Sequence, residues 1–245
     1  MQTIALISRK GGSGKTTLAV HLALSAYLGR RHVLVADTGN QLSAAEVLMA
    51  LSAYLGRRHV LVANTGNQVS AAEVLKPRGG KGPTVVETTG RDLCAVQRQA
   101  VRDHVDLMVI DTAAGLEESL SHAIVLADLS LLVVRPSFLD IASAVQSLQV
   151  IRRMKRSALV VLSQAPPARE GVETPTVQHA LAVFKAMNIP VVPEIVRVRL
   201  IYQTAMQRGC AVQEIAPSGL AAREIEALWD TVEHSVHDPP RPRTG

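Results

Sequence analysis

The chain has 245 residues, of which 47% are hydrophobic and 19% charged, a composition that predicts a packed core and excludes a disordered chain. Aromatic residues make up only 2% of the chain, so a surface that binds nucleic acid by stacking bases on aromatic rings is not expected. The formal net charge of +5 permits contact with nucleic acid or an acidic surface, although an ordinary solvated surface accounts for it equally well.

The first two elements predicted along the chain flank a glycine-rich loop. Thr3–Ser8 is an apolar run typical of a strand, and Lys15–Leu28 has the pattern of a helix. The segment SRKGGSGKTT, residues 8–17, joins them. Glycines in such a loop let the backbone approach a ligand closely, and the helix N-terminus behind them attracts an anion. The sequence therefore predicts a phosphate-binding loop.

The predicted phosphate contacts come from this loop and from the first helical turn: Gly11, Gly12, Ser13, Gly14, Lys15, Thr16 and Thr17. Lys15 is placed to reach the β- and γ-phosphates of a nucleotide, and the Thr16 hydroxyl is placed to ligate Mg²⁺. The loop departs from the common pattern G-x-x-x-x-G-K-[ST], because Arg9 stands where that pattern has a glycine.

The next segment contains an internal tandem duplication. Ala23–Leu48 recurs 27 residues later as Ala50–Leu75, and the copies differ at two positions, one of which places Asp37 in the first copy and Asn64 in the second. Two copies are too few for a repeat architecture, because stacked repeats need at least three units to bury a continuous core. The near-identity indicates a recent duplication or an artefact of cloning or sequencing. Without one period the chain would have 218 residues, a usual size for one α/β domain.

The rest of the chain alternates β-branched runs with helical patterns, which is typical of a mostly parallel, twisted sheet covered by helices on both faces. Further strands are predicted at His32–Ala36, Val105–Ile110, Ser130–Val134, Ala158–Leu162 and Val191–Val192. Further helices are predicted at Ser137–Arg153, Thr176–Met187 and Ala221–His234. The expected fold class is a single α/β domain over residues 1–236.

Two segments outside these elements are expected to be flexible. Lys76–Pro83 has the composition of a basic loop, and residues 237–245 form a Pro-rich tail. Cys94 and Cys210 lie far apart and outside any C-x-x-C pattern, so neither a metal cluster nor a disulfide framework is indicated. No signal peptide and no uncharged run of about 18 residues is present. We therefore expect a cytoplasmic protein.

The glycine-rich loop resembles that of one known family. KGGSGKTT, residues 10–17, is similar to the deviant Walker A loop of the ParA/MinD family of P-loop ATPases, which has a lysine near its start. By position this lysine is Lys10, and the resemblance implies that it crosses a dimer interface to the nucleotide of the partner subunit. Arg9 is then no defect, since the family normally has a non-glycine residue there.

Further segments resemble the family in the same order. Residues 33–45 are similar to its second strand and switch I, residues 106–115 to its Walker B strand, and residues 129–144 to its next strand and Pro-Ser-x-x-Asp turn. Residues 199–229 resemble the closing region of small ParA proteins. The resemblance implies a P-loop NTPase fold with ATP and Mg²⁺ as cofactors. It implies Lys10, Lys15, Asp37 and Asp111 as catalytic residues, and Thr16, Asp111 and Asp37 around the metal.

Switch I departs from the family pattern. Where the family usually has a second Asp followed by Pro, this chain has Gly39-Asn40 in one copy and Gly66-Asn67 in the other. In the family that Asp is associated with positioning the attacking water. Three interpretations stay open: an ATPase with slow, partner-stimulated turnover, a non-hydrolysing scaffold that dimerises on ATP, or a monomer that only binds nucleotide because the duplication disturbs the dimer surface.

The first copy of the duplicated segment is the expected active-site copy. It keeps Asp37, whereas Asn64 of the second copy cannot supply a carboxylate charge beside Mg²⁺. The first copy also follows the predicted loop helix without a break. We therefore expect residues 50–75 to be an insertion, either an added helix–strand unit or a displaced loop.

The resemblance and the charge pattern together indicate the partners. The closing helix carries several acidic residues that acidic lipid would repel, so no membrane anchor is expected. Because the predicted first strand begins at Thr3, we expect no N-terminal helix-turn-helix domain. The resemblance thus implies a small ParA-like ATPase that forms a homodimer on ATP binding and associates with the nucleoid. A ParB-like or adaptor protein would stimulate it, and it would drive plasmid or chromosome partition or position another cargo.

Non-specific DNA binding requires clustered cations that neutralise phosphates, and it makes the affinity sensitive to salt. The candidate DNA contacts are Arg152, Arg153, Lys155, Arg156, Arg197, Arg199 and Arg208.

Overall fold

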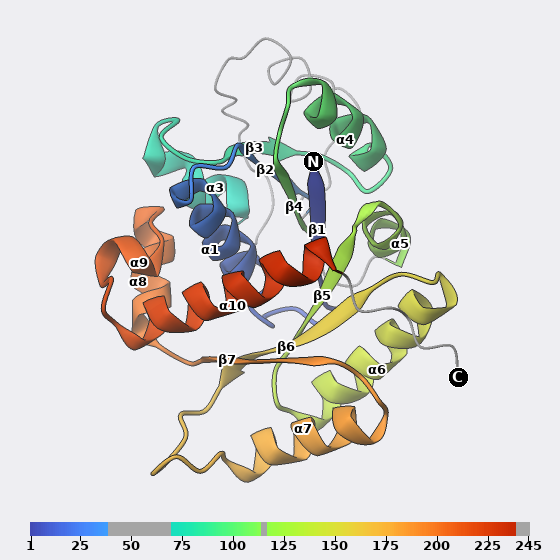
Figure 1. Ribbon diagram of the computed structural model, residues 1–245, viewed down its shortest axis with the longest axis vertical. Coiled ribbons are helices and arrows are strands. Elements are labelled where there is room, and N and C mark those ends of the chain that lie inside the picture. The colour runs from blue at the N-terminus through green and yellow to red at the C-terminus, as the bar shows by residue number, and fades with distance from the viewer. Residues whose placement is uncertain (39–69, 114–116, 239–245) are drawn as a thin grey trace.

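The structure, a computed structural model, describes residues 1–38, 70–113 and 117–238. These residues contain a seven-stranded sheet in the order β3-β2-β4-β1-β5-β6-β7, in which all neighbouring strands are parallel. Helices cover both faces of the sheet (Figure 1). The predicted fold class, a single α/β domain with a parallel sheet covered by helices on both faces, is confirmed.

The strands are short and mostly buried. They are β1 Gln2–Ile7, β2 Val33–Asp37, β3 Thr84–Glu87, β4 Leu107–Asp111, β5 Leu129–Val134, β6 Ala158–Ala165 and β7 Val191–Arg197. Six of them overlap the predicted strands. The sequence pattern does not predict β3, because four residues at a sheet edge, paired only with β2, give too short an apolar run.

The helices begin and end close to the predicted limits where they were predicted. They are α1 Lys15–Leu28, α3 Ala71–Leu75, the 3₁₀ helix η1 Lys76–Arg78, α4 Leu93–Arg102, α5 Glu117–Leu126, α6 Phe138–Arg153, α7 Pro175–Ala186, α8 Leu200–Arg208, α9 Val212–Ile215 and α10 Leu220–His237. Among these, α1 has the predicted bounds, and Ser137 caps α6 by accepting a hydrogen bond from the Asp140 amide. None of these helices is both long and apolar enough to cross a membrane.

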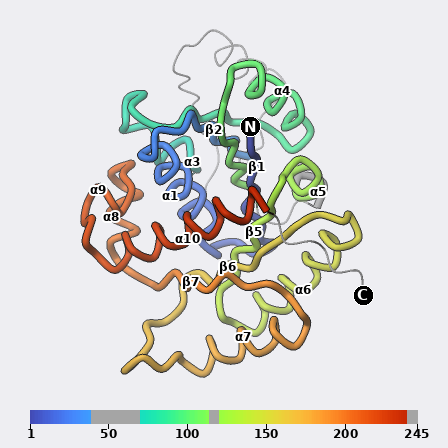
Figure 2. The backbone as a smooth tube through the Cα atoms, viewed as in Figure 1, coloured from blue at the N-terminus to red at the C-terminus, as the bar shows by residue number. Residues whose placement is uncertain are grey.

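Two hydrophobic layers enclose the sheet. The β1 side chains alternate between them: Ile4 and Leu6 face the layer under α1, α3, α8, α9 and α10, whereas Ala5 and Ile7 face the layer under α4, α5, α6 and α7. Figure 2 shows the same two sets of helices on either side of the central strands. Both layers consist almost wholly of aliphatic residues, as the low aromatic content of the chain requires.

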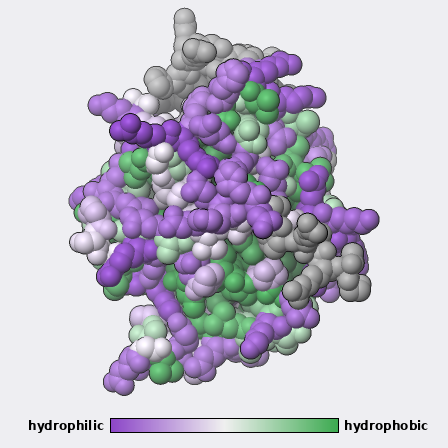
Figure 3. All heavy atoms as spheres, in the orientation of Figure 1, coloured by the Kyte–Doolittle hydropathy of each residue, from purple (hydrophilic) through white to green (hydrophobic). Residues whose placement is uncertain are grey.

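The closing helix α10 is amphipathic. Ile225, Leu228 and Val232 are fully buried, whereas Glu226 and Asp230 on the opposite side are exposed. In the space-filling view α10 is accordingly hydrophilic, and hydrophobic residues gather between α10 and α7 near β6 and β7 (Figure 3). The apolar side of α10 therefore packs on the sheet and not on an external surface.

Both copies of the duplicated segment contribute to the described fold. The first copy supplies β2 with Asp37, and the end of the second copy supplies α3. Ser70 and Glu73 form a capping box at the start of α3, and Ala71 and Val74 lie in the core. The Ala72 amide donates to Asp37 Oδ2 at 3.3 Å, so the two copies meet at one carboxylate. Because residues 39–69 lie outside the described residues, the limits of the insertion stay a prediction.

The basic segment 76–83, expected to be flexible, is anchored by Arg78. Its Nη1 and Nη2 donate to the Glu214 carboxylate at 2.7 and 3.0 Å, and its Nη1 also donates to the Gly209 carbonyl at 3.1 Å. The first three residues of the segment form η1. The expectation of a free loop is therefore wrong for this half of the segment, because sequence alone does not show Glu214 beside it.

A buried histidine lies in the helix that follows the glycine-rich loop. His21 is fully buried, its Nδ1 donates to the Thr17 carbonyl at 2.7 Å, and its ring contacts Tyr202 edge to face at 5.3 Å between centroids. Burial disfavours the charged imidazolium and lowers the pKa of His21 to about 4, although the hydrogen bond to Thr17 opposes this.

The buried His21 predicts a pH-dependent stability. Its folded-state pKa lies below the unfolded value, so its contribution is complete above pH 6.5 and is lost as pH falls toward 4. Between pH 7.5 and pH 5 this one group should remove about 2 kcal/mol from the free energy of unfolding. Urea denaturation at both pH values should show a smaller loss for His21→Gln than for the unmodified protein. The control His179→Gln, at an exposed position, should behave like the unmodified protein; equal losses in all three would contradict the assignment.

Candidate phosphate-binding site

The glycine-rich loop joins β1 to α1 in a backbone conformation that requires glycine. Gly12 has φ 71° and Gly14 has φ 94°, in the left-handed region that other residues rarely adopt. A Cβ on Gly14 would lie 2.8 Å from Ser163 Oγ at the end of β6. In addition, Gln164 Nε2 donates to the Gly12 carbonyl at 2.7 Å. The end of β6 therefore packs against the loop and holds it in place.

The first turn of α1 presents its backbone amides without a competing cap. Gly14 is the N-cap residue, no side chain caps the helix, and no acidic residue lies in its first turn. Four amides at a helix N-terminus have no intrahelical partner, and the helix dipole makes this end attractive to an anion. This geometry supports phosphate binding at residues 11–17, where the sequence predicts it.

Two carboxylates end neighbouring strands beside Lys15. Asp37 of β2 and Asp111 of β4 are paired in register, and both are buried, as is Lys15. Burial and the charge of Asp37 raise the pKa of Asp111 to about 7, whereas a hydrogen bond from Thr16 and the charge of Lys15 oppose the rise. Burial also lowers the pKa of Lys15, and the charge of Asp111 opposes this shift. The fold thus brings together four residues that the resemblance places around a metal and a nucleotide: Lys15, Thr16, Asp37 and Asp111.

The same residues fit a hydrated Mg²⁺ ion. Asp111 Oδ1 is buried and accepts no hydrogen bond from the described residues, an unfavourable state that a metal-bound water would relieve. The described residues include no group of three or more His, Cys, Asp or Glu side chains arranged to hold a metal by themselves. Mg²⁺ suits such a site, because it usually keeps several waters and takes its remaining ligands from one or two protein oxygens and from substrate phosphates.

A hydroxyl after β2 connects the two carboxylate strands. The Thr38 amide and Oγ1 both donate to the Asp111 carbonyl, at 3.0 and 3.1 Å, and Oγ1 accepts a hydrogen bond from the Ala113 amide at 3.2 Å. Thr112 Oγ1 donates to the Leu6 carbonyl at 2.6 Å. These bonds hold the backbone after Asp37 and Asp111 in place. Gly39-Asn40, on which the expected turnover depends, lie outside the described residues.

Lys10 lies in the first half of the loop that joins β1 to α1. It is exposed, and its side chain has no hydrogen-bond or ion-pair partner among the described residues. Its neighbour Arg9 instead reaches α6, where its Nη1 donates to Gln146 Oε1 at 3.4 Å. Arg9 is thus tied to α6, whereas the exposed side chain of Lys10 is available to a second molecule.

Sequence reasoning missed several residues at this site. Glu87 ends β3 in register with Asp37, so three buried acidic residues end three adjacent strands. Gln164 and Arg135 approach the loop from the ends of β6 and β5. Glu87 was missed because β3 was not predicted. The only sequence signal for Gln164 and Arg135 is that each lies at the carboxyl end of an apolar run predicted to be a strand.

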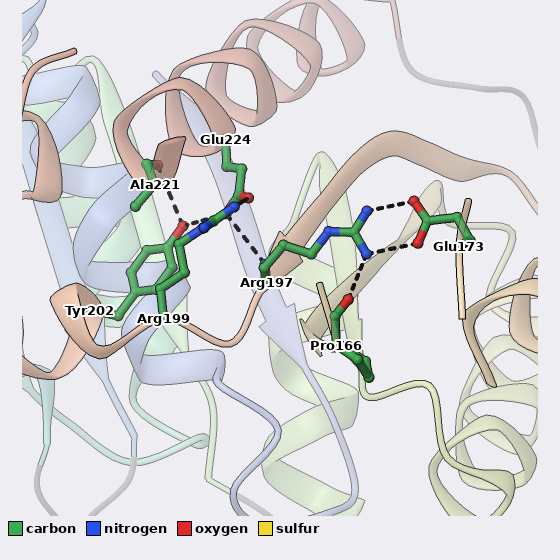
Figure 4. Close-up of polar contacts among 7 residues, drawn as sticks. All are labelled: Pro166, Glu173, Arg197, Arg199, Tyr202, Ala221 and Glu224. Carbon is green, nitrogen blue, oxygen red and sulfur yellow. Dashed lines mark hydrogen bonds and ion pairs between the residues drawn. The ribbon is translucent and has the colours of Figure 1, made fainter. Parts of the chain in front are cut away.

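The structure pairs two of the candidate DNA contacts with carboxylates (Figure 4). Arg197 donates to both oxygens of Glu173, at 2.5 and 2.8 Å, and to the Pro166 carbonyl at 2.8 Å. Arg199 donates to Glu224 at 2.5 Å, and the same carboxylate accepts a hydrogen bond from the Tyr202 hydroxyl at 3.2 Å. These two arginines tie α10 and the β6–α7 connection to β7, and their charges are largely balanced.

The seven candidates do not form one patch. Residues 152–156 lie at the end of α6, just before β6 begins, and therefore at the amino ends of the strands. The glycine-rich loop lies at the opposite, carboxyl ends of the strands. There, Arg152 Nη2 donates to the carbonyls of Met187 and Asn188 at 3.3 and 3.1 Å. Arg197 ends β7 and Arg199 follows it, at the carboxyl ends of the strands, where the glycine-rich loop also lies. Arg208 lies separately, in the last turn of α8.

A strand, a glycine-rich loop and an uncapped helix N-terminus, with an aspartate ending the neighbouring strand of a parallel sheet, define the class of P-loop NTPases. Residues 4–208 match the model of the CobQ/CobB/MinD/ParA nucleotide binding domain family. The chain therefore belongs to this family, as the resemblance of its loop predicted. A search of curated protein sequences gives no match.

Several solved structures share the fold over nearly the whole chain. The apo form of McdA from Cyanothece superposes with a TM-score of 0.69 at 17% identity, covering 95% of this chain and 99% of that one. The septum site-determining protein MinD of Pyrococcus horikoshii, complexed with Mg-ADP, gives 0.66 at 20% identity, with coverage of 95% and 96%. A ParA family ATPase from Chlorobium tepidum gives 0.64 at 16% identity, with coverage of 93% and 97%.

Proposed function

We propose that this chain is a small ParA-like ATPase. It forms a homodimer on ATP binding, binds DNA without sequence preference, and partitions a plasmid or chromosome or positions another cargo. Its hydrolysis is slow and stimulated by a ParB-like or adaptor protein. The observation that carries the proposal is the loop itself, where the buried Lys15 interacts with the buried Asp111 and Lys10 is exposed to solvent.

The nucleotide part of the proposal rests on the described geometry. The amides of residues 11–17 and Lys15 hold the phosphates, and Thr16, Asp37 and Asp111 hold the hydrated Mg²⁺. Mg²⁺ neutralises phosphate charge, on which phosphoryl transfer depends. The presence of Mg-ADP in the related MinD structure supports this assignment.

The dimer part rests on what surrounds the loop. Besides Lys10, large apolar side chains are exposed on the segments that follow β5 and β7, at the same edge of the sheet: Phe138, Leu139, Val198 and Leu200. Exposed apolar groups next to a binding site are typical of surfaces that meet another protein. A second copy of the chain placed there would bring its own Lys10 to this nucleotide.

The DNA-binding part of the proposal rests on the candidate cations that form no ion pair with a carboxylate among the described residues. Arg197 and Arg199 are balanced by Glu173 and Glu224, so they contribute less to phosphate binding than the other five candidates. The remaining positive charge is concentrated at residues 152–156. Binding should weaken steeply with salt and should be independent of sequence.

The second candidate is an ATP-dependent scaffold that does not hydrolyse its nucleotide. The observation that favours it is Gly39-Asn40 in place of the Asp-Pro that the family usually has in switch I. Nucleotide could then close the dimer without turnover.

Light scattering with Mg²⁺ and either ADP or a slowly hydrolysed ATP analogue tests the proposal. We expect the molar mass to double only with the ATP analogue, and Lys10→Ala to remain monomeric while it still binds nucleotide. Lys185→Ala, at an exposed position of α7, should dimerise like the unmodified protein. A Lys10→Ala variant that dimerises normally would refute the role of Lys10.

Steady-state ATPase and DNA-retention assays on the same proteins separate the two candidates. Turnover that depends on Lys15 excludes the scaffold. An ATP-dependent dimer without turnover, with or without DNA, excludes the ATPase instead. DNA retention that does not depend on ATP, or that is insensitive to salt, would contradict the proposed form of DNA binding.

A further inference from the structure

One arginine lies directly over the glycine-rich loop. Arg135 follows β5, and its Nη1 lies 3.8 Å from the point that a Cβ on Gly12 would occupy. Its guanidinium therefore lies on the side of Gly12 where any other residue would carry a side chain. Among the described residues, Nη1 has no hydrogen-bond acceptor, although the other two nitrogens of the group do.

Those two nitrogens hold the guanidinium in a fixed orientation. Nε and Nη2 of Arg135 donate to the two oxygens of Asp140, at 2.9 and 3.2 Å. Asp140 is buried and also accepts a hydrogen bond from Ser137 Oγ at 2.5 Å. A bidentate arginine–carboxylate pair is geometrically specific, so the third nitrogen is directed and not free to rotate.

The position in the sheet puts Arg135 opposite the acidic side of the site. In the strand order, β1 lies between β4, which ends in Asp111, and β5, which leads to Arg135. The loop after β1 therefore lies between Asp111, beside the proposed Mg²⁺ site, and the guanidinium of Arg135. Gly12 lies within the loop itself, before Lys15 and the Thr16–Thr17 turn that opens α1.

We infer that Arg135 contacts the terminal phosphate of a nucleoside triphosphate bound in the loop of the same chain, and so makes the site prefer a triphosphate to a diphosphate. The inference rests on the proposed nucleotide binding and adds to it a residue that discriminates between the two nucleotide states. A guanidinium that already shares two nitrogens with a carboxylate can still donate from its third to a phosphate oxygen. Asp140 acts as a positioning residue, because it holds Arg135 and lies on the far side of the guanidinium.

The test compares two affinities in three proteins. Isothermal titration calorimetry with Mg²⁺ measures the dissociation constants of ATPγS and ADP for the unmodified protein, for Arg135→Gln and for Arg102→Gln. The last variant makes the same charge change on an exposed side chain in the last turn of α4. We expect Arg135→Gln to weaken ATPγS binding roughly tenfold and ADP binding less than about threefold, since a charge-assisted hydrogen bond is lost only with the triphosphate. Arg102→Gln should leave both constants unchanged.

Each other outcome has a defined meaning. Equal weakening for the two nucleotides, or none, would overturn the inference while leaving nucleotide binding intact. An unmodified protein that binds neither nucleotide would overturn the proposed function itself. Thermal denaturation without nucleotide checks that the variants fold. If Arg135→Gln does not fold, Arg135→Lys carries the test: it keeps the charge but cannot hold Asp140 and a phosphate together, so the ATPγS preference should still fall.

Discussion

Lys15→Ala is expected to reduce ATP affinity by roughly 100-fold or more, because it removes the buried cation that we propose to contact the phosphates. Lys15 also balances the charge of the buried Asp111, which ends β4 next to Asp37 of β2. Its loss leaves Asp37 and Asp111 beside each other with less positive charge nearby. The variant without nucleotide should therefore also be less stable to urea than the unmodified protein.

The two effects of Lys15→Ala can be separated with a second substitution. In Lys15→Ala/Asp111→Asn one of the two buried negative charges is also gone, so the stability should recover while ATP affinity stays low. Calorimetric titration measures the affinity, and urea denaturation measures the stability. Lys185→Ala should change neither. If Lys15→Ala binds ATP normally, this loop is not the nucleotide site.

Gly14→Ala is expected to destabilise the fold by about 2 kcal/mol or more. The position has φ 94°, and the added methyl group would lie 2.8 Å from Ser163 Oγ, so both the backbone and the packing resist the change. Since the loop must shift to accommodate the methyl group, ATP affinity should fall as well. Urea denaturation and calorimetric titration measure the two effects.

The chain provides a matched control for this substitution. Gly11 lies in the same loop, but a Cβ there would meet no atom within 4 Å, and its φ lies outside the left-handed region. Gly11→Ala should therefore change the stability by less than about 0.5 kcal/mol. Adding Ser163→Ala to Gly14→Ala should restore part of the stability, because it removes the contact but not the backbone strain. Equal stability of the two glycine variants would show that Gly14 is not constrained.

The parts of the fold that could be predicted from the sequence are those determined over short distances. The bounds of α1 follow from a glycine-rich loop and an apolar helix pattern that are contiguous in the chain. Six strands are long or apolar enough to be recognised, whereas β3 is neither, and Glu87 was missed with it. The family follows from eight consecutive residues of the loop, and the family model matches residues 4–208.

Contacts between distant segments could not be predicted in the same way. Gln164 meets Gly12 across 152 positions, and Arg78 meets Glu214 across 136. Whether an arginine is available to DNA depends on such contacts, as the pairing of Arg197 with Glu173 and of Arg199 with Glu224 shows. Neither the composition nor a local motif shows which carboxylate lies next to a given arginine in the folded chain.

The sequence by itself determined the kind of protein, because a phosphate-binding loop is a local device: a strand end, three glycines, a lysine and a helix start within about fifteen residues. Only the tertiary structure decided how this loop is surrounded. The parallel order β3-β2-β4-β1-β5-β6 brings the ends of separate strands to one edge. There Glu87, Asp37 and Asp111 lie on one side of the loop, and Arg135 and Gln164 reach it from the other. Strand order sets these neighbours, and strand order is a property of the folded sheet.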